Sequence, residues 1–387
     1  MRETRLETEP QTVGVIGGGQ LCRMLCEAVS PLGLEVVFVD PTPDAPANHV
    51  ARDQIVGGFD DADAVERLAE RADVLTYDIE LADPDVVESA AEDAGVPVHP
   101  HPDTLRTIQD KYVQKEALTE EGVPVPAYRA VETVEDLRAA ADELGLPLML
   151  KAREGGYDGR GNVPVETEDD FEDALGAVEG KVMVEEFIDY DRELSVIAAQ
   201  GDGEEAFFPV TETVHREEIL RRTVTPARTD EKTRERAREV AREVLNVMEG
   251  RGVYGIEMFE DDGKILVNEI APRPHNSGHW TIEGARTSQF EQHARGVVGA
   301  PLGSTELRAP TVSVNILGDG GPRDVSLAGV EELLASDAHL HWYGKKEERP
   351  LRKLGHFTLT GDGDADGGTD ELLREADDVQ DELRFEK

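Results

Sequence analysis

The sequence predicts an α/β protein with an N-terminal parallel sheet, a larger central unit and a small C-terminal unit. Three observations support this. Short apolar runs alternate with segments of helical spacing near the N-terminus, glycine-rich turns follow two of these runs, and 387 residues are too many for one small core. Strands that alternate with helices imply a parallel sheet with right-handed crossovers.

The first unit is expected to span residues 1–110. Its predicted elements are strands at 12–16, 34–39, 73–77 and 96–98 and a helix at 20–29. The turn Gly17-Gly18-Gly19 joins the first strand to the helix, an arrangement that can hold a phosphate at the helix N-terminus. Cys22 stands where a dinucleotide fingerprint needs its third glycine, which argues against NAD binding. A close structural turn without a ligand remains an equal alternative.

The second unit is expected at 111–305 and the third at 306–387. Predicted helices of the second unit cover 110–121, 132–144, 234–248 and 290–298, and predicted strands cover 148–152, 181–187, 193–199, 254–259 and 264–270. The last two strands should form a hairpin around Asp261-Asp262-Gly263. The third unit begins near Thr311 with alternating apolar residues, and its acidic, glycine-rich end is expected to be partly mobile.

The charge composition points to a salty environment. The chain has 83 acidic and 40 basic residues, a net charge of −43. Self-repulsion at this charge destabilises a compact state, and salt near 1 M shortens the Debye length to roughly 3 Å. Because the acids are spread along the chain, we interpret them as adaptation to a salty cytoplasm of a halophile rather than as a patch for a basic partner. The charge argues against nucleic-acid and anionic-membrane binding.

The two cysteines and the hydropathy pattern indicate a soluble cytoplasmic protein. Cys22 and Cys26 are too few for a disulfide framework and fit small apolar core positions on a helix. The sequence has no signal-peptide pattern and no apolar run near ~18 residues.

A glycine-rich loop at 155–161 follows the strand that contains Lys151. Glycines let backbone N–H groups approach a polyphosphate. The loop is not a P-loop, because no Gly-Lys-Ser/Thr follows it. Lys151 before the loop and Arg160 within it favour a polyphosphate ligand over a purely structural loop.

Glu257 and Glu269 each lie within an apolar strand of the predicted hairpin. Buried carboxylates need a cationic partner, and Mg²⁺ that bridges nucleotide phosphates fits this need. Both must face the same side, which in a regular antiparallel ladder requires a loop of odd length. We therefore predict a loop such as Glu260 to Lys264 instead of a two-residue turn. The alternative is an exposed edge strand.

Two further segments are rich in polar and charged side chains. In 268–281, Pro272 and Pro274 fix the path of the chain, so that Arg273, His275 and Asn276 are preorganised to stabilise an anion. The alternative is a metal site at His275 and His279, although no Cys or His cluster completes a zinc site. The second segment holds five cations in nine positions and favours a phosphate site over a solvated surface: Lys345, Lys346, Arg349, Arg352 and Lys353.

In this order, these elements resemble the ATP-grasp ligases, and among them the 5-(carboxyamino)imidazole ribonucleotide synthases. The stretches that carry the resemblance are 17–24, 155–161, 268–273, 275–281 and 342–356. The resemblance implies an ATP-grasp fold with an N-terminal Rossmann-like pre-ATP-grasp domain and a small C-terminal domain. It also implies a homodimer. It implies that ATP, bicarbonate and 5-aminoimidazole ribonucleotide react through carboxyphosphate to give the carbamate, ADP and phosphate. It implies Mg²⁺ as the metal cofactor.

The resemblance also implies roles for individual residues. Nucleotide contacts fall on Lys111, Lys151, Gly156, Tyr157, Asp158, Gly159, Arg160, Gly161, Asn162, Glu185, Glu186, Phe187, Ile188, Glu193, His215, Asn268 and Glu269. Mg²⁺ ligands fall on Glu257 and Glu269. Catalytic roles fall on Asp158, Arg160, Arg273, His275 and Asn276, and substrate contacts on Gln20, Tyr157, Lys345 and Arg352.

Two other functions stay open from the residues. One is another ATP-grasp ligase, such as the formate-using glycinamide ribonucleotide transformylase. The other is a non-catalytic nucleotide-binding regulator, against which the joint presence of Lys151, Asp158, Glu257, Glu269 and Arg273 argues.

Overall fold

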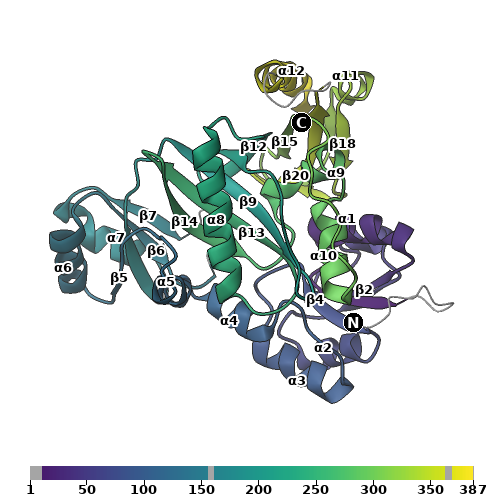
Figure 1. Cartoon of the computed structure of the whole chain (residues 1–387), viewed down its shortest axis with the longest axis horizontal. Coiled ribbons are helices and arrows are strands. Elements are labelled where there is room, and N and C mark those ends of the chain that lie inside the picture. The colour runs from purple at the N-terminus through teal and green to yellow at the C-terminus, as the bar shows by residue number, and fades with distance from the viewer. Residues whose placement is uncertain (1–10, 156–160, 362–367, 387) are drawn as a thin grey trace.

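The computed structural model describes residues 11–155, 161–361 and 368–386. The chain forms a parallel-sheet domain, a small outer lobe, and a long central sheet whose far end carries the C-terminal helices (Figure 1). No described helix is long and apolar enough to cross a membrane.

The first domain is a four-stranded parallel sheet in the order β3-β2-β1-β4, which confirms the predicted parallel arrangement. Its elements are β1 (Thr12–Ile16), α1 (Gln20–Val29), β2 (Glu35–Asp40), β3 (Asp53–Val56), α2 (Ala62–Ala69), β4 (Val74–Tyr77) and α3 (Pro84–Ala94). The predicted strand at 96–98 is only an isolated bridge between Val98 and Leu75. Cys22 and Cys26 are free thiols buried in the core beside this sheet, as predicted.

The glycine turn after β1 is required by close packing. A Cβ on Gly18 would lie 2.1 Å from the Phe38 ring, and Gly17 has φ +104°, a conformation that other residues rarely adopt. The turn therefore brings the start of α1 directly against β2, where no side chain fits between them.

The small outer lobe is a four-stranded antiparallel sheet covered by two helices (Figure 1). Its elements are β5 (Tyr128–Val131), α6 (Val134–Leu144), β6 (Leu148–Ala152), β7 (Asn162–Val165), α7 (Phe171–Ala177) and β8 (Val182–Glu186). Thr133 and Asp136 form a capping box that starts α6. Two further helices, α4 (Pro102–Gln109) and α5 (Lys111–Glu120), connect this lobe to the first domain.

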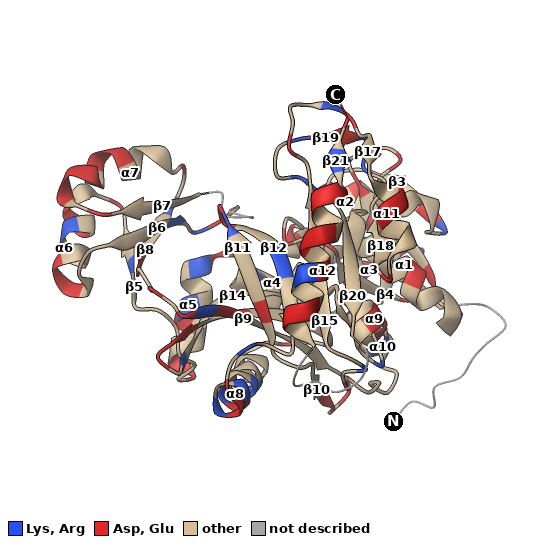
Figure 2. Ribbon diagram, turned by 90° about the horizontal axis from the view of Figure 1, so that it is seen from above, with Lys and Arg blue, Asp and Glu red and all other residues tan. Residues whose placement is uncertain are grey.

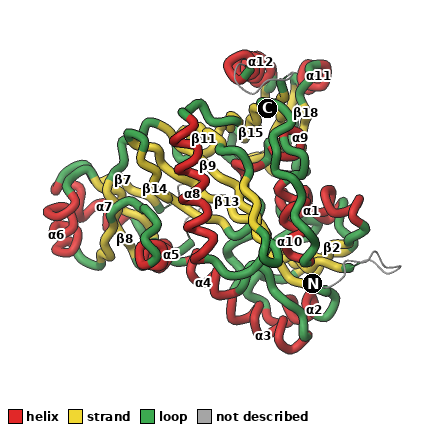
Figure 3. Tube along the Cα trace, viewed as in Figure 1, coloured by secondary structure: helices red, strands yellow, loops and turns green. Residues whose placement is uncertain are grey.

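The central sheet has the order β14-β13-β9-β11-β12-β15-β20-β18, with β10 added beside β9. Its elements are β9 (Arg192–Gln200), β10 (Glu205–Phe207), β11 (Thr211–Arg216), β12 (Ile219–Thr225), β13 (Gly252–Asp261), β14 (Lys264–Ala271), β15 (Thr311–Leu317), β18 (His339–Trp342) and β20 (Lys353–Thr360). Helix α8 (Glu231–Val247) packs across β9 and β14 through its apolar face. Because β12 pairs with β15, the C-terminal strands continue the same sheet (Figure 3).

The hairpin between β13 and β14 corrects one prediction. Asp261 pairs with Lys264 around a two-residue turn, Asp262-Gly263, so the predicted longer loop is wrong. Both turn residues have positive φ, as a primed hairpin turn requires. A bulge then shifts the register by one residue, and Glu257 pairs directly with Glu269. The two carboxylates therefore face the same side through a bulge, and not through the length of the loop.

Part of the acidic C-terminal segment forms a helix. Residues Thr369–Glu382 form α12, and its buried face packs Leu372, Ala376 and Val379 into a cluster with β15 and β20. Apolar residues at helical spacing outweigh the acidic composition here. The remaining elements are α9 (Thr281–Gly284), α10 (Gln289–Val298), β16 (Arg323–Asp324), β17 (Leu327–Ala328), α11 (Val330–Ala335), β19 (Glu347–Glu348) and β21 (Arg384–Phe385).

The acidic residues are distributed over the molecule and include both helices of the outer lobe, α6 and α7 (Figure 2). Many of the basic residues are paired with acids. This distribution agrees with the interpretation of the charge as a property of the whole surface.

Candidate active site

Three lysines gather where the outer lobe meets the central sheet, and two of them pair with one buried carboxylate. Lys151 on β6 lies 2.9 Å from one oxygen of Glu185, and Lys115 on α5 lies 3.3 Å from the other. Burial opposes ionisation of Glu185, but the two lysines outweigh it and lower its pKa to about 2. Burial lowers the pKa of Lys115 to about 8. Lys151 also donates to Asn268 Oδ1 at 3.3 Å, which joins the outer lobe to β14.

The third lysine links this cluster to the paired carboxylates. Lys111, at the start of α5, lies 3.1 Å from Glu269. Desolvation favours the neutral acid at Glu269, but the ion pair with Lys111 prevails and lowers its pKa. Asp110 caps α5 by accepting the Tyr112 and Val113 N–H groups, and it is held in turn by Arg153.

Glu257 lies between its neighbour Glu269 and two more charged side chains. Burial, together with the charges of Glu269 and Glu193, raises the pKa of Glu257 to about 7. His215 on β11 forms an ion pair with Glu193 on β9, and this bond raises the pKa of His215 despite its burial. Glu193 and His215, both predicted nucleotide contacts, thus adjoin the carboxylate pair.

The polar loop after β14 lies between the central sheet and the first domain. The Arg273 guanidinium is 2.8 Å from a carboxylate oxygen of Glu80, which follows β4. His275 is half-buried, and desolvation together with the positive charge of Arg273 holds its pKa well below the usual range. Its Nδ1 lies 2.8 Å from Ser277 Oγ. Both amide atoms of Asn276 are buried and have no hydrogen-bond partner among the described residues.

The first glycine turn offers less to a phosphate than its sequence suggests. The Gly18 N–H donates to Asp40 at 2.9 Å, and the Gly19 N–H donates to Asp78 at 2.7 Å. Burial raises the pKa of Asp78 to about 7, although Arg273 and the Gly19 N–H act in the opposite direction. The turn therefore satisfies its own donors, which favours the structural alternative.

The basic segment at 345–353 lies beside the start of the first domain. Tyr343 O accepts a 3.5 Å bond from Arg23 on α1, and Lys346 pairs with Asp44. Lys345 donates to Lys353 O at 2.8 Å, and Arg352 donates to Glu347 O at 2.7 Å. Lys353 is close enough to Glu257 and His215 to influence their pKa values. The segment therefore borders the same site as the carboxylate pair.

The other predicted residues lie as follows. Gly156, Tyr157, Asp158, Gly159 and Arg160 are outside the described residues. Glu186 accepts the Ala127 N–H at 2.8 Å, Phe187 is exposed and Ile188 is half-buried. Gly161 accepts from the Ala152 N–H at 2.9 Å, and Asn162 reaches Glu218 at 3.4 Å. Gln20 is the half-buried first residue of α1.

The sequence reasoning assigned no role to four residues of this site. Asp78 and Glu80 follow β4 at the carboxyl edge of the parallel sheet, where polar groups commonly meet a ligand. That position was a usable signal. Lys115 and Gln289 are buried polar residues on helices, and nothing in the sequence distinguishes them from ordinary surface residues.

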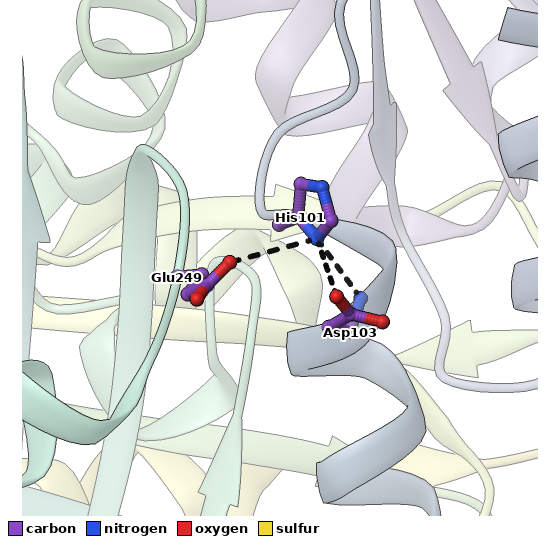
Figure 4. A group of neighbouring side chains, drawn as sticks. All are labelled: His101, Asp103 and Glu249. Carbon is purple, nitrogen blue, oxygen red and sulfur yellow. Dashed lines mark hydrogen bonds and ion pairs between the residues drawn. The ribbon is translucent and has the colours of Figure 1, made fainter. Parts of the chain in front are cut away.

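The metal alternative at His275 and His279 has no support in the structure. His279 is stacked between Phe290 and His356, and burial holds its pKa well below the usual range. One group of His, Asp and Glu in the described ranges has metal-like spacing: His101, Asp103 and Glu249 (Figure 4). His101 Nδ1 already accepts the Asp103 N–H at 3.2 Å as the cap of α4, so this group acts as a helix cap.

Two lobes that hold lysines and paired carboxylates between them are the arrangement of an ATP-grasp enzyme. Residues 116–290 match the ATP-grasp domain, residues 10–109 the ribonucleotide synthetase preATP-grasp domain, and residues 311–367 the phosphoribosylaminoimidazole carboxylase C-terminal domain. The α/β ATP-grasp fold with its two flanking domains is thereby confirmed.

Relatives along nearly the whole chain narrow the assignment. The N5-carboxyaminoimidazole ribonucleotide synthase of Bacillus subtilis is 38% identical over 350 residues, which are 90% of this chain and 90% of that protein. The structure of the corresponding synthetase from Thermotoga maritima is 44% identical, with a TM-score of 0.86, and the match covers 97% of this chain and 99% of that chain. The chain belongs to the N5-carboxyaminoimidazole ribonucleotide synthase family.

Two structures of the synthase from Aspergillus clavatus show ligands. Both are 35% identical to this chain. The complex with ATP has a TM-score of 0.89, covering 97% of this chain and 100% of that chain. The complex with ADP and 5-aminoimidazole ribonucleotide has a TM-score of 0.88, covering 96% and 99%. The reaction of this chain is therefore the ATP-dependent conversion of 5-aminoimidazole ribonucleotide to its N5-carboxy derivative in purine biosynthesis, a ligase reaction.

Proposed function

We propose that the carboxyl group comes from bicarbonate, activated by ATP as carboxyphosphate, at the loop that contains Arg273, His275 and Asn276. The observation that carries this proposal is the pair of buried amide atoms of Asn276 without a partner among the described residues. Buried polar groups are normally hydrogen-bonded, so these atoms call for a small polar ligand. Arg273 beside them supplies positive charge, and a neutral His275 supplies an adaptable donor or acceptor.

The proposed reaction has two steps. A bicarbonate oxygen attacks the γ-phosphorus of ATP, and the bond from that phosphorus to the bridging oxygen of ADP breaks. The exocyclic amine of 5-aminoimidazole ribonucleotide then forms a C–N bond to the carboxyl carbon, or to CO₂ released from it, while the C–O bond to phosphate breaks. The amine loses one proton to the departing phosphate. The role of the protein is to position the reactants and to neutralise charge on the transferred phosphoryl group.

Mg²⁺ fits the residues present. Glu257 and Glu269 are adjacent across the hairpin, and desolvation of Glu257 together with the charge of Glu269 raises the pKa of Glu257. Their oxygens and the Asn268 amide oxygen suit a hard cation that also binds phosphate. When bound, the ion would neutralise charge on the β- and γ-phosphates.

The remaining residue roles follow from position. We assign ATP contacts to Lys111, Lys151, Gly156, Tyr157, Asp158, Gly159, Arg160, Gly161, Asn162, Glu185, Glu186, Phe187, Ile188, Glu193, His215, Asn268 and Glu269. We assign contacts with the aminoimidazole ribonucleotide to Gln20, Tyr157, Lys345 and Arg352, and catalytic roles to Asp158 and Arg160 besides the loop residues. The convergence of Lys111, Lys115 and Lys151 supports the phosphate contacts, and the position of the basic segment beside α1 supports the 5′-phosphate site.

Several broader expectations remain predictions. These are the division at residues 110 and 305, the homodimer, the cytoplasmic location and the halophilic origin. Light scattering in molar KCl tests the homodimer. The salt dependence of stability tests the adaptation to salt.

Isotopic labelling tests the proposed chemistry. With ¹⁸O-labelled bicarbonate in molar KCl, the carboxyphosphate route transfers one bicarbonate oxygen into the phosphate product, because the attacking oxygen stays on phosphorus. ADP release should depend on Mg²⁺ and be stimulated strongly by 5-aminoimidazole ribonucleotide. Phosphate without label, or turnover stimulated instead by formate and glycinamide ribonucleotide, would contradict the proposal.

A further inference from the structure

Helix α10 carries two fully buried glutamines, Gln289 and Gln292, in the contact between the first domain and the central sheet. The helix packs on α1 and β4 from one side and on β9 and β13 from the other (Figure 1). A buried primary amide costs free energy unless its donors and acceptor are satisfied. The hydrogen-bond partners of each glutamine therefore indicate which part of the chain its side chain holds in place.

Gln289 clamps the backbone of His275. Its Nε2 donates to His275 O at 2.7 Å, and its Oε1 accepts the His275 N–H at 2.8 Å. The amide therefore satisfies both polar groups of one residue, as a neighbouring strand would. Nε2 also faces Nδ1 of His279 at 3.3 Å.

Two further features of the turn 275–281 accommodate the Gln289 side chain and backbone. A Cβ on Gly278 would lie 2.5 Å from Gln289 Oε1, so a glycine leaves room for the amide. The Gln289 N–H donates to Thr281 Oγ1 at 2.9 Å, and Thr281 Oγ1 donates to Gly278 O at 2.6 Å. The first residue of α10 thus holds both ends of the turn 275–281.

The clamped backbone carries the groups assigned to carboxyl activation. His275 precedes Asn276 directly and lies two residues after Arg273. The ring of His275 is held separately, because Ser277 Oγ lies 2.8 Å from its Nδ1 and 2.6 Å from Ser195 Oγ. Gln289 fixes the main chain from the opposite element, so loss of the clamp releases the loop without removing any group from it.

We propose that Gln289 is a positioning residue for carboxyl transfer, which holds the His275–Asn276 backbone at the geometry that the reaction requires. The inference rests on the proposed role of this loop. A misplacement of about 1 Å at a reacting group can lower the rate about 100-fold. Loss of the clamp should therefore affect turnover and its coupling far more than ATP binding, whose lysines lie on other elements.

Gln292 provides a matched control. It is also fully buried on α10, its Nε2 donates to Gly303 O at 2.7 Å, and its Oε1 accepts the Gly303 N–H at 2.8 Å. The chemistry of the two clamps is the same, but Gly303 lies outside the loop that carries the reaction. Changes at Gln292 should cost similar stability and spare turnover.

The experiment compares Gln289→Glu, Gln289→Met and Gln292→Glu in the full chain at molar KCl. Glutamate keeps an acceptor for the His275 N–H and removes the donor to His275 O, whereas methionine keeps the volume and removes both. We expect the Gln289 variants to lower kcat about 10- to 100-fold. The KM for ATP should stay within about threefold of wild type, and more ADP should be released per carboxylated product. Gln292→Glu should lose a similar amount of Tm and keep kcat within about threefold.

Three results would overturn the proposal. The first is unchanged kcat and coupling in a folded Gln289 variant. The second is an equal loss of kcat in Gln292→Glu, which would show a general packing effect. The third is that neither Gln289 variant folds while Gln292→Glu does, which would make Gln289 a structural residue. Methionine buries no charge, so that variant tests the clamp even if the glutamate variant unfolds.

Two measurements in the same assay separate this inference from the proposed function. If wild type incorporates no bicarbonate, the proposed function fails whatever Gln289 does. If wild type incorporates bicarbonate but His275→Ala keeps full kcat, the loop is not the reaction site and Gln289 has nothing to position. Loss of kcat in both His275→Ala and the Gln289 variants, with a normal Gln292→Glu, supports the positioning role.

Discussion

Replacement of Lys115 by methionine should weaken both the fold and the binding of ATP. The Lys115 side chain is 1% exposed and pairs with Glu185, which is 3% exposed and has Lys151 as its second partner. Lys115 Nζ also donates to Val267 O at 3.2 Å on β14. Methionine fills a similar volume but leaves Glu185 with one cation and the Val267 carbonyl without this donor.

The magnitude follows from the partners that remain. Removal of one member of an isolated buried ion pair costs about 3–5 kcal/mol. Lys151 still neutralises Glu185, so we expect about 2–3 kcal/mol. For a chain of 387 residues, with an unfolding entropy of about 2.1 cal/mol/K per residue, that is a fall in Tm of about 2–4 °C. Lys151 also becomes the sole partner of Glu185, so its movement toward an ATP phosphate costs more. About 1.4 kcal/mol of that cost corresponds to a tenfold rise in the KM for ATP.

Thermal unfolding and steady-state kinetics in molar KCl measure the two effects. Lys232→Met is the control, because Lys232 is exposed at the start of α8 and its loss should change stability by less than about 0.5 kcal/mol. The buried pair is screened little by salt, so the difference should persist at high KCl. The double variant Lys115→Met with Glu185→Gln should recover part of the lost Tm. A Lys115→Met protein with the Tm and ATP KM of the control would refute the reasoning.

Three further predictions concern salt, pH and metal. The Tm of the wild type should rise between 0.1 M and 2 M KCl, because the Debye length falls from about 10 Å at 0.1 M to about 3 Å at 1 M and self-repulsion is screened. A Tm that does not change with KCl would contradict the interpretation of the net charge of −43. Burial raises the pKa of Asp78 from 3.8 to about 7, so the protonated acid favours the folded state and its contribution is lost as the pH rises through 7. Asp78→Asn should therefore gain Tm relative to wild type between pH 5 and pH 8 in paired melts, and an equal difference at both pH values would exclude this titration. Glu269→Gln should raise the half-saturating Mg²⁺ concentration for ADP release at least about tenfold, because one of the two anionic ligands loses its charge. An unchanged Mg²⁺ titration would show that Glu269 is not a metal ligand.

Local sequence signals predicted much of the fold because they depend on near neighbours. Periodicity and turn residues placed β1, α1 and β6 at their observed bounds. The resemblance carried by 155–161 and 268–281 identified the family from short motifs. Acidic composition did not predict α12, where a few apolar residues at helical spacing accompany the helix.

The register of the hairpin shows where such signals end. Counting along the chain gives the parity of a regular ladder, but a bulge adds one residue without a clear mark in the sequence. The same-side placement of Glu257 and Glu269 was therefore right while the predicted loop was wrong.

The sequence by itself determined the strand and helix pattern, the motifs and the family, because each of these is written in residues close together along the chain. The tertiary structure decided which polar residues share a site. Glu80 meets Arg273 across 193 positions, Lys151 meets Asn268 across 117, and Gln289 reaches back over a turn to hold His275. The physical reason is that a buried charge or amide pairs with whichever polar group the fold places beside it. Composition and local spacing do not indicate which distant segment supplies that group.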